Sequence, residues 1–290
     1  MARTVNFRAD LHLHTAFSDG TLSPGDMVRW AREAGMAVIA VTDHDVVDGL
    51  AEAAAVGKEA GVQVINGLEM TAGEEEEIHL LGYGMDPSGQ ALRAFLGAQL
   101  MERQGRMLAM LERLKALGIP IAKEEIIGWN SRFAGRMNLA RAMVAKGYAA
   151  SVREAFDRFL RPGKPAYIPR KHIETVRGVE MLRSFGAVVC LAHPGRLAMD
   201  RFSLVQRLPG WIEAGLNGLE AYHASHAEAD ALWFDRTARS RGLLVTGGSD
   251  CHGPSPGGSR IGDHLDRWRT VREDVRDLIG QIEQGTAKIQ

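Results

Sequence analysis

The sequence predicts an α/β protein in which a mostly parallel sheet forms a barrel or a relative of one. Short apolar runs typical of buried strands alternate with stretches of helical length, and most runs are followed directly by polar residues. This alternation builds a parallel sheet covered by helices, with functional side chains at the carboxyl ends of the strands. The 290 residues suffice for one large barrel or for two smaller domains.

The strands are predicted from two kinds of pattern. Around His12, polar and apolar residues alternate, which places His12 and His14 on the same face of a strand. The other strands are short apolar runs typical of a buried sheet. In chain order they are residues 36–41, 62–65, 78–83, 187–192, 216–222 and 243–246.

Helices are predicted between these strands from their end signals. Residues 23–35 begin with Ser23 as a cap and Pro24 in the first turn, and they close with Gly35. Similar units cover residues 47–61 and 204–215. Each of these units is followed by a strand, as a parallel sheet requires.

The alternation stops between residues 88 and 171, where helical stretches predominate. These stretches are residues 92–117, 138–147 and 151–160, followed by a loop at 161–165 that is rich in Pro and Gly. We therefore predict a barrel domain made of residues 1–87 and 172–290. A small helical cap, residues 88–171, is inserted into it.

Residues that can bind metal ions follow most of the predicted strands. A single histidine near a strand end is usually structural, but the repetition of the pattern favours a metal site. Nine residues share this setting: His12, His14, Asp19, His44, Glu69, His79, His193, Asp250 and His252. Nine ligands are enough to hold three ions.

Two other features have simpler interpretations. The two cysteines, Cys190 and Cys251, are too few for a disulfide framework and lack the spacing of a zinc–thiolate site, which suits a reducing cytoplasm. Cys251 is interpreted as a small buried residue, although candidate ligands flank it. The four consecutive glutamates at 74–77 cannot converge on one ion and are interpreted as a solvated hairpin tip.

Composition excludes some classes of partner. Lys and Arg number 35 against 36 Asp and Glu, so a net charge of −1 provides no basic field for duplex DNA. No apolar run approaches the roughly 20 residues that cross a bilayer, and the N-terminus lacks the pattern of a signal peptide. We expect a cytoplasmic protein without membrane association that acts on a small or short anionic substrate. Protein partners are left open.

The ligand pattern resembles that of the PHP (polymerase and histidinol phosphatase) phosphoesterases. The motifs His12-Leu13-His14, Asp19, His44, Glu69, His79, His193 and Asp250-Cys251-His252 match it in order and without a gap. The resemblance implies a distorted (β/α)7 barrel with three divalent ions. By this carry-over, one ion is held by His12, His14, Glu69 and Asp250, the second by Glu69, His79 and His193, and the third by Asp19, His44 and His252.

The ligand types restrict the metal and the reaction. Imidazole and carboxylate without thiolate suit Mn²⁺, Fe²⁺ or Zn²⁺ and disfavour Mg²⁺, so we expect Mn²⁺ with Fe²⁺ or Zn²⁺ as alternatives. Hydrolysis by metal-bound hydroxide needs no protein nucleophile. The sequence contains neither a Gly-x-Ser-x-Gly elbow nor a P-loop, which favours this direct attack.

Residues outside the ligand set must select the substrate. Arg136, Asn138 and Arg170 of the predicted cap are candidate phosphate-binding residues, because guanidinium groups match phosphate oxygens. His223 follows the strand 216–222, so it could contact the substrate or protonate the leaving oxygen. A structural role for His223 is an equal alternative. Arg196, shortly after His193, is a weaker candidate.

Within the family, the motif order, the short length and the helical insert are similar to bacterial 3′,5′-nucleoside bisphosphate phosphatases and the related RNase AM exoribonucleases. This implies release of the 3′-phosphate from pAp-like nucleotides and 5′-to-3′ trimming of short 5′-phosphorylated RNA. The alternatives are a histidinol-phosphate phosphomonoesterase, a PHP module that binds without catalysis, and an amidohydrolase that cleaves C–N bonds. The complete ligand set argues against the second, and the absence of lysine from the ligand motifs argues against the third.

Overall fold

The computed structural model describes residues 7–287 except residues 75, 127–128, 130–134, 170–172 and 256. The chain divides into two compact units, one made of residues 1–92 and 172–290 and the other of residues 93–171. In the following, they are called the barrel unit and the helical unit.

The barrel unit contains a seven-stranded sheet in which the strand order follows the chain order. Neighbouring strands are parallel, except that β4 is antiparallel to both β3 and β5. Residues 73–77 connect β3 to β4, and a link this short forces an antiparallel turn because parallel crossovers need a dozen or more residues. The predicted, mostly parallel sheet is confirmed. Its strands are β1 (Ala9–Leu13), β2 (Val38–Val41), β3 (Gln63–Ala72), β4 (Ile78–Tyr83), β5 (Val188–Leu191), β6 (Gly218–His223) and β7 (Leu244–Gly248).

The first and last strands meet at what we call the β1–β7 seam. Leu13 forms a parallel bridge with Cys251, and the Asp250 amide donates a 3.0 Å hydrogen bond to the carbonyl oxygen of His12. Glycine is required at position 248, because a Cβ there would lie 2.2 Å from the Cβ of His12. The sheet is therefore a nearly closed barrel, which confirms the predicted barrel class.

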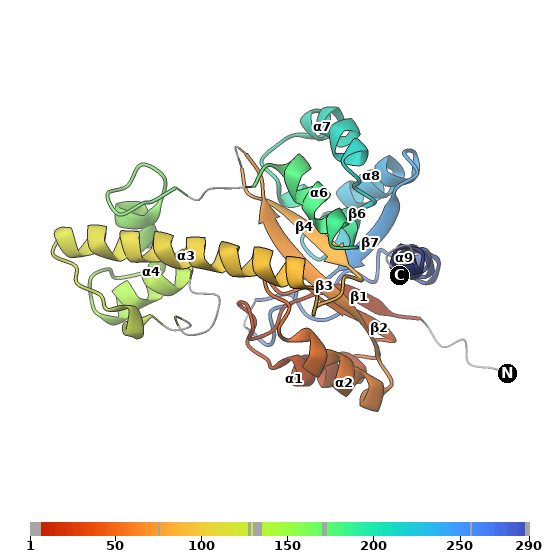
Figure 1. Cartoon of the computed structure of the whole chain (residues 1–290), viewed down its shortest axis with the longest axis horizontal. Helices are drawn as coiled ribbons and strands as arrows, with labels where there is room; N and C mark the ends of the chain where they lie inside the picture. The colour runs from red at the N-terminus through yellow and green to blue at the C-terminus, as the bar shows by residue number, and fades with distance from the viewer. Residues whose placement is uncertain are drawn as a thin grey trace. The chain divides into compact units, whose positions relative to one another are not determined.

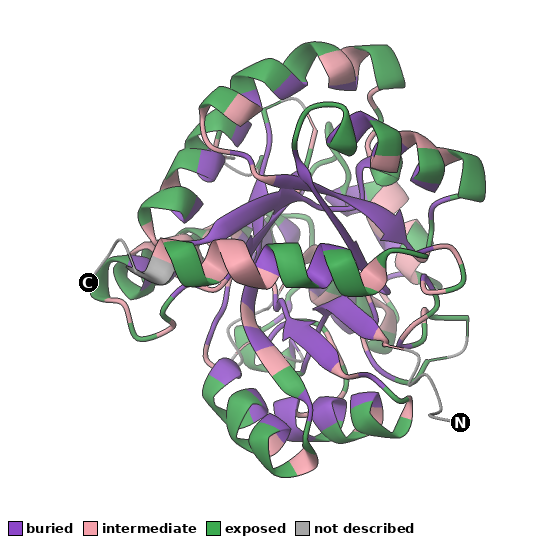
Figure 2. Ribbon diagram, turned by 90° about the vertical axis from the view of Figure 1, so that its right-hand side faces the viewer, coloured by how far each residue is buried: buried purple, intermediate pink, exposed green. Residues whose placement is uncertain are grey.

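Helices cover the outside of this sheet (Figure 1). The strands are almost wholly buried, whereas the helices expose one side to solvent (Figure 2). The first helix has the predicted end signals: Ser23 accepts a hydrogen bond from the Asp26 amide, and Gly35 follows the last turn with a φ of 78°. The helices of this unit are α1 (Pro24–Glu33), α2 (Leu50–Ala60), α6 (Thr175–Ser184), α7 (Arg201–Glu213), α8 (Glu228–Arg239) and α9 (Val271–Ala287), with a 3₁₀ turn η3 (Pro194–Arg196).

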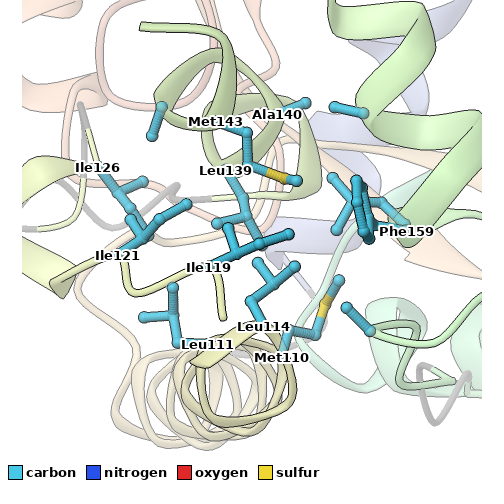
Figure 3. Packing of buried hydrophobic residues seen from close by; sticks show 14 of the residues in the cluster. Met110, Leu111, Leu114, Ile119, Ile121, Ile126, Leu139, Ala140, Met143 and Phe159 are labelled. Atoms are coloured by element: carbon cyan, nitrogen blue, oxygen red, sulfur yellow. The ribbon is translucent and has the colours of Figure 1, made fainter. Parts of the chain in front are cut away.

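The helical unit has an apolar core of its own. Leu114, Leu139, Met143 and Phe159 are buried in one cluster (Figure 3). The elements of the helical unit are α3 (Gln90–Ala116), which begins in the barrel unit, the 3₁₀ turn η1 (Lys123–Glu125), α4 (Arg136–Ala145), α5 (Val152–Ala155) and the π-helical turn η2 (Phe156–Leu160). Across the described part of the chain, we find no helix with the length and apolar character needed to span a bilayer.

Candidate metal centre

The nine predicted ligands gather at one end of the barrel. His12, His44, His193, Asp250 and their neighbours lie at the carboxyl ends of parallel strands. His79 lies near the amino end of β4, and because β4 runs antiparallel, this end faces the same way. At the centre is Glu69 of β3, whose carboxylate is only 1% exposed.

The first ligand group joins the two ends of the chain. The Oε2 atom of Glu69 lies 3.2 Å from Nε2 of His12 and 3.1 Å from Nε2 of His14. The Oδ1 atom of Asp250 lies 3.1 Å from the same nitrogen of His14. These four residues offer atoms close enough together for a single ion, and they are the set that the family resemblance implies for one ion.

The second group surrounds Asp19. Its Oδ1 atom lies 3.2 Å from Nε2 of His252 and 3.7 Å from Nδ1 of His14, and its Oδ2 atom lies 3.9 Å from Nε2 of His44. This group contains the expected Asp19, His44 and His252, with His14 beside them.

The third group lies on the other side of Glu69. The Oε1 atom of Glu69 is 2.8 Å from Nδ1 of His79 and 3.0 Å from Nε2 of His193. Nδ1 of His44 is 3.1 Å from Oε2 of Glu69. His44 therefore faces both Glu69 and Asp19, an arrangement that the order of motifs along the chain does not reveal.

Charge is unusually concentrated in this cluster. Burial opposes ionisation of Glu69, but the neighbouring imidazoles, His44 and His79 first, hold the pKa of its carboxyl well below its usual range. Burial also works against protonation of His14, yet the adjacent carboxylates of Asp250 and Glu69 raise its pKa to about 10. His44 differs, because burial and the nearby His14 and His79 outweigh Glu69 and lower its pKa to about 4. Protons and cations thus compete for the same buried carboxylates.

The residues fit divalent cations. The Oε2 atom of Glu69 is buried and approached by three imidazole nitrogens, yet it has no hydrogen-bond partner among the described residues. A buried carboxylate oxygen in this state is costly unless a cation faces it. The donor set of imidazole nitrogens and carboxylate oxygens suits Mn²⁺, Fe²⁺ or Zn²⁺.

Backbone strain is also located here. Among the described residues, the non-glycine residues with positive φ are Asp45 (51°), His193 (27°) and Asp250 (55°). Such conformations persist only where the surroundings enforce them, and they cluster at functional sites. His193 and Asp250 are predicted ligands, and Asp45 directly follows the predicted ligand His44.

Comparison with known proteins gives the family of this cluster. A family model described as "PHP domain" matches residues 10–121. A 3′,5′-nucleoside bisphosphate phosphatase of Chromobacterium violaceum is 33% identical over 94% of this chain and 97% of that protein. The chain belongs to the PHP family.

Other PHP relatives differ in their named reactions. A phosphoribosyl 1,2-cyclic phosphate 1,2-diphosphodiesterase of Eggerthella lenta is 32% identical over 84% of this chain and 94% of that protein. A 5′-3′ exoribonuclease of Haemophilus influenzae is 30% identical over 89% of this chain and 94% of that protein.

Solved structures agree with the PHP fold. An amidohydrolase from Chromobacterium violaceum with bound sulfate has a TM-score of 0.81 and 32% identity, covering 94% of this chain and 96% of that one. A protein from Bifidobacterium adolescentis, described as a metal-dependent phosphoesterase, has a TM-score of 0.80 and 30% identity, covering 95% and 96%.

Three buried carboxylates contact the predicted ligands or the loops that carry them, and they were not identified from the sequence. Asp43 accepts hydrogen bonds from the amide and hydroxyl of Thr15 and the hydroxyl of Ser18, at 2.6–2.7 Å, and so fixes the loop between His14 and Asp19. Asp10 accepts hydrogen bonds from the amides of Ser249 and Gly262, both at 2.9 Å. Glu220 contacts His12 and His193. The sequence feature that could have identified these carboxylates is an acidic residue inside or directly beside an apolar strand.

His223 ends β6 beside the ligands, as predicted. Its Nε2 atom lies 3.5 Å from Oδ2 of Asp250, and its Nδ1 atom accepts a 3.1 Å hydrogen bond from the Ser225 amide. Arg196 lies in the same region, with Nη1 2.7 Å from Oδ2 of Asp250. Both side chains therefore face the same oxygen of Asp250.

The predicted cap residues belong to the helical unit. The guanidinium of Arg136 lies 5.6 Å from the ring centre of Tyr167. Oδ1 of Asn138 accepts a 3.1 Å hydrogen bond from the Gly135 amide, which explains why α4 begins at Arg136, two residues before the predicted start. Arg170 lies outside the described residues. Phosphate binding by these three residues stays a prediction.

Glu74, Glu76 and Glu77 lie in the predicted hairpin tip between β3 and β4, and Glu75 lies outside the described residues. They are more engaged than a merely solvated tip would be, because Glu74 accepts a hydrogen bond from the Thr175 amide and Oε1 of Glu77 lies 3.2 Å from Nε2 of His79. Cys251 is buried, as predicted.

Proposed function

We propose that this PHP protein is a metal-dependent phosphoesterase that releases the 3′-phosphate from nucleoside 3′,5′-bisphosphates such as pAp and trims short 5′-phosphorylated RNA from its 5′ end. The observation that carries the proposal is the convergence of buried imidazoles and carboxylates on Glu69, in a chain that is similar over 94% of its length to a bisphosphate phosphatase. The named exoribonuclease relative supports the second activity. Both reactions break a 3′-phosphate ester.

Three divalent ions are proposed, with Mn²⁺ first and Fe²⁺ or Zn²⁺ as alternatives. His12, His14, Glu69 and Asp250 would hold one, Glu69, His79 and His193 the second, and Asp19, His44 and His252 the third. When bound, such ions supply an activated water and positive charge at the phosphate oxygens. The number and kind of ions can be measured directly on the purified protein.

His223 is proposed to deliver the proton that the leaving oxygen needs. Because its Nδ1 atom accepts the hydrogen bond from the Ser225 amide, the neutral ring carries its proton on Nε2. That Nε2 atom is buried, has no hydrogen-bond partner among the described residues and faces Asp250. A proton held there is available to a substrate oxygen.

Arginines are proposed to bind the phosphates. The side chain of Arg196 is 54% exposed and reaches Asp250, so its guanidinium can pair with an anion at the edge of the ligand cluster. Arg136, Asn138 and Arg170 are proposed to bind the second phosphate, with residues 88–171 as the cap. A cytoplasmic location is proposed as well, because Cys190 and Cys251 are both unpaired.

The test is phosphate release from pAp and from histidinol phosphate by protein loaded with Mn²⁺, with a chelated sample as the control. We expect rapid, metal-dependent release from pAp and little from histidinol phosphate. A 5′-phosphorylated trinucleotide should then lose its first nucleotide. Turnover of histidinol phosphate alone would contradict the nucleotide phosphatase proposal and favour a histidinol-phosphate phosphomonoesterase.

A cyclic phosphate diester belongs in the same assay, because the diphosphodiesterase relative is almost as similar as the bisphosphate phosphatase. The similarity to the bisphosphate phosphatase covers 94% of this chain and that to the diphosphodiesterase covers 84%, which favours a bisphosphate substrate. Metal binding without turnover of any of these substrates would leave a binding module as the better interpretation.

A further inference from the structure

We propose that Glu220 is a positioning residue that serves two ions at once, by orienting the ring of His12 and fixing the backbone of His193. The inference rests on the proposed function, which assigns His12 and His193 to different ions. Glu220 itself lies within β6 and is fully buried. It would act on the metal centre only through the two histidines.

Both oxygens of the Glu220 carboxylate are engaged. Oε1 lies 3.0 Å from Nδ1 of His12, and Oε2 accepts a 2.7 Å hydrogen bond from the amide of His193. Each oxygen of this buried carboxylate therefore has its own partner, and the two partners belong to different strand ends.

The first contact determines which nitrogen of His12 can bind a metal. An acceptor at Nδ1 keeps a proton on that atom, so the lone pair of the ring remains on Nε2. Nε2 is the atom that lies 3.2 Å from Glu69 and 3.5 Å from Asp250. Glu220 thus presents His12 to the first ligand group with the correct atom free.

The second contact holds a strained turn. His193 has a φ of 27°, a conformation that costs a non-glycine residue free energy. Its amide is held by Glu220, and two residues later the Gly195 amide donates a 3.0 Å hydrogen bond to Nε2 of His226. His226 is itself fixed by the Ala221 carbonyl, 2.9 Å from its Nδ1. The segment from Glu220 to His226 therefore supports the turn that presents His193.

Space for this arrangement comes from β7. A Cβ added at Gly248 would lie 2.9 Å from Oε1 of Glu220 and 2.2 Å from the Cβ of His12. Strands β1, β6 and β7 thus meet around the Glu220 carboxylate, and position 248 has no room for a side chain larger than that of glycine. Such close packing suits a group whose task is to hold others in place.

The test is the Glu220→Gln variant, which keeps the shape but cannot accept hydrogen bonds at both positions. We expect its Mn²⁺ affinity, measured by competition with a chelator, to fall about 10- to 100-fold, as is typical when a partner of a metal-bound histidine is lost. The loss should affect the two ions assigned to His12 and His193, whereas the ion at Asp19 should be retained. In the Zn²⁺-loaded protein, the downfield proton resonance of His12 Nδ1 should move upfield, because a neutral amide is a weaker acceptor than a carboxylate.

The matched control is Asp274→Asn. Asp274 is also a buried carboxylate, but its hydrogen-bond donors among the described residues are Trp268, Thr270 and Arg239, none of which is a predicted metal ligand. This variant should lower the melting temperature and leave the Mn²⁺ affinity unchanged. Equal Mn²⁺ affinity in Glu220→Gln and the wild-type protein, or equal losses in Glu220→Gln and the control, would overturn the proposal.

Glu220→Asp provides a second route if the glutamine variant does not fold. It keeps the buried charge but is one methylene shorter, so it cannot hold both histidines, and we expect a smaller loss of affinity for the same two ions. Wild-type affinity in this variant would count against the proposal. All these readouts need no substrate, so an inactive wild-type protein that binds Mn²⁺ would contradict the proposed function without deciding the role of Glu220.

Discussion

The barrel unit and the helical unit bury different kinds of side chain. The described core of the helical unit is made of Leu, Ile, Met, Ala and Phe, as in any small helical protein. The barrel unit buries Asp10, His12, His14, Glu69 and Glu220 almost completely. Burying apolar groups stabilises a fold directly, whereas burying charged groups is costly unless each is paired.

The difference shows what each unit is built for. In the helical unit, the free energy of unfolding depends on packing. In the barrel unit, part of the interior is given over to groups that oppose burial, and their electrostatic balance is completed when cations bind. Substitutions in the core of the helical unit should therefore lower stability without changing metal binding, and substitutions in the buried charged cluster of the barrel unit should change metal binding.

The largest effect is expected from Glu69→Gln. Removing the charge that all three ligand groups approach should abolish tight Mn²⁺ binding and reduce phosphate release to the level of the chelated protein. The control is Glu125→Gln in the helical unit, where an exposed ion pair with Lys146 is lost. Metal content per chain and release from pAp are the measurements. A Glu69→Gln protein with full activity would remove the proposed mechanism.

Leu139→Ala should have the opposite pattern of effects: it should lower stability and leave metal binding unchanged. Leu139 is fully buried in α4, and removing such a side chain costs about 2–5 kcal/mol of stability. Denaturant unfolding should show this loss, while the number of ions bound per chain stays constant. If the ions are lost as well, the two units are coupled more strongly than the comparison implies.

Removal of metal should destabilise the barrel unit. At a free-ion concentration about 100 times the dissociation constant, binding stabilises a fold by roughly 2.7 kcal/mol, and a chelator removes this contribution. Hydrogen exchange should speed up in β1, β3 and β7 and remain the same in α4. Equal changes in peptides from both units would contradict the contrast between them.

The smallest effect is expected from Arg136→Ala. A hydrogen bond to a charged group contributes about 1.5–3 kcal/mol, so KM for pAp should rise roughly 10- to 100-fold while KM for an aryl phosphate changes little. Arg141→Ala, an exposed arginine on the same helix, serves as the control. Equal losses on both substrates would show that Arg136 does not bind the second phosphate.

The sequence was most informative where a strand ends in a polar residue. Apolar runs mark buried strands, and in a parallel sheet their ends share one edge, so His12, His44 and His193 could be expected near each other. Partners that lie inside the sheet could not be assigned in this way. Glu220 is central to β6 and meets His12 from a strand 208 positions away in the chain, a register that periodicity does not contain.

Strand pairing and the contacts of individual side chains were the other features that the sequence did not fully predict. The antiparallel β4 agrees with the hairpin tip predicted at residues 74–77, but the strand before it was predicted to end at residue 65, whereas β3 runs to Ala72. His44 uses both ring nitrogens, one toward Glu69 and one toward Asp19, and ring orientation depends on the folded backbone. For Asn138, phosphate binding stays a prediction, and the hydrogen bond that its Oδ1 atom accepts from the Gly135 amide at the start of α4 could not be assigned from the sequence.

The β1–β7 seam ties one end of the chain to the other. The hydrogen bond from the Ser249 amide to Asp10 joins residues 239 positions apart, and His12 and Asp250 lie beside it. A link between such distant points removes conformational freedom from the unfolded chain, as a disulfide does. An ion shared by His12 and Asp250 would thus be a reversible clasp that keeps the barrel shut, in a protein whose two cysteines are both unpaired.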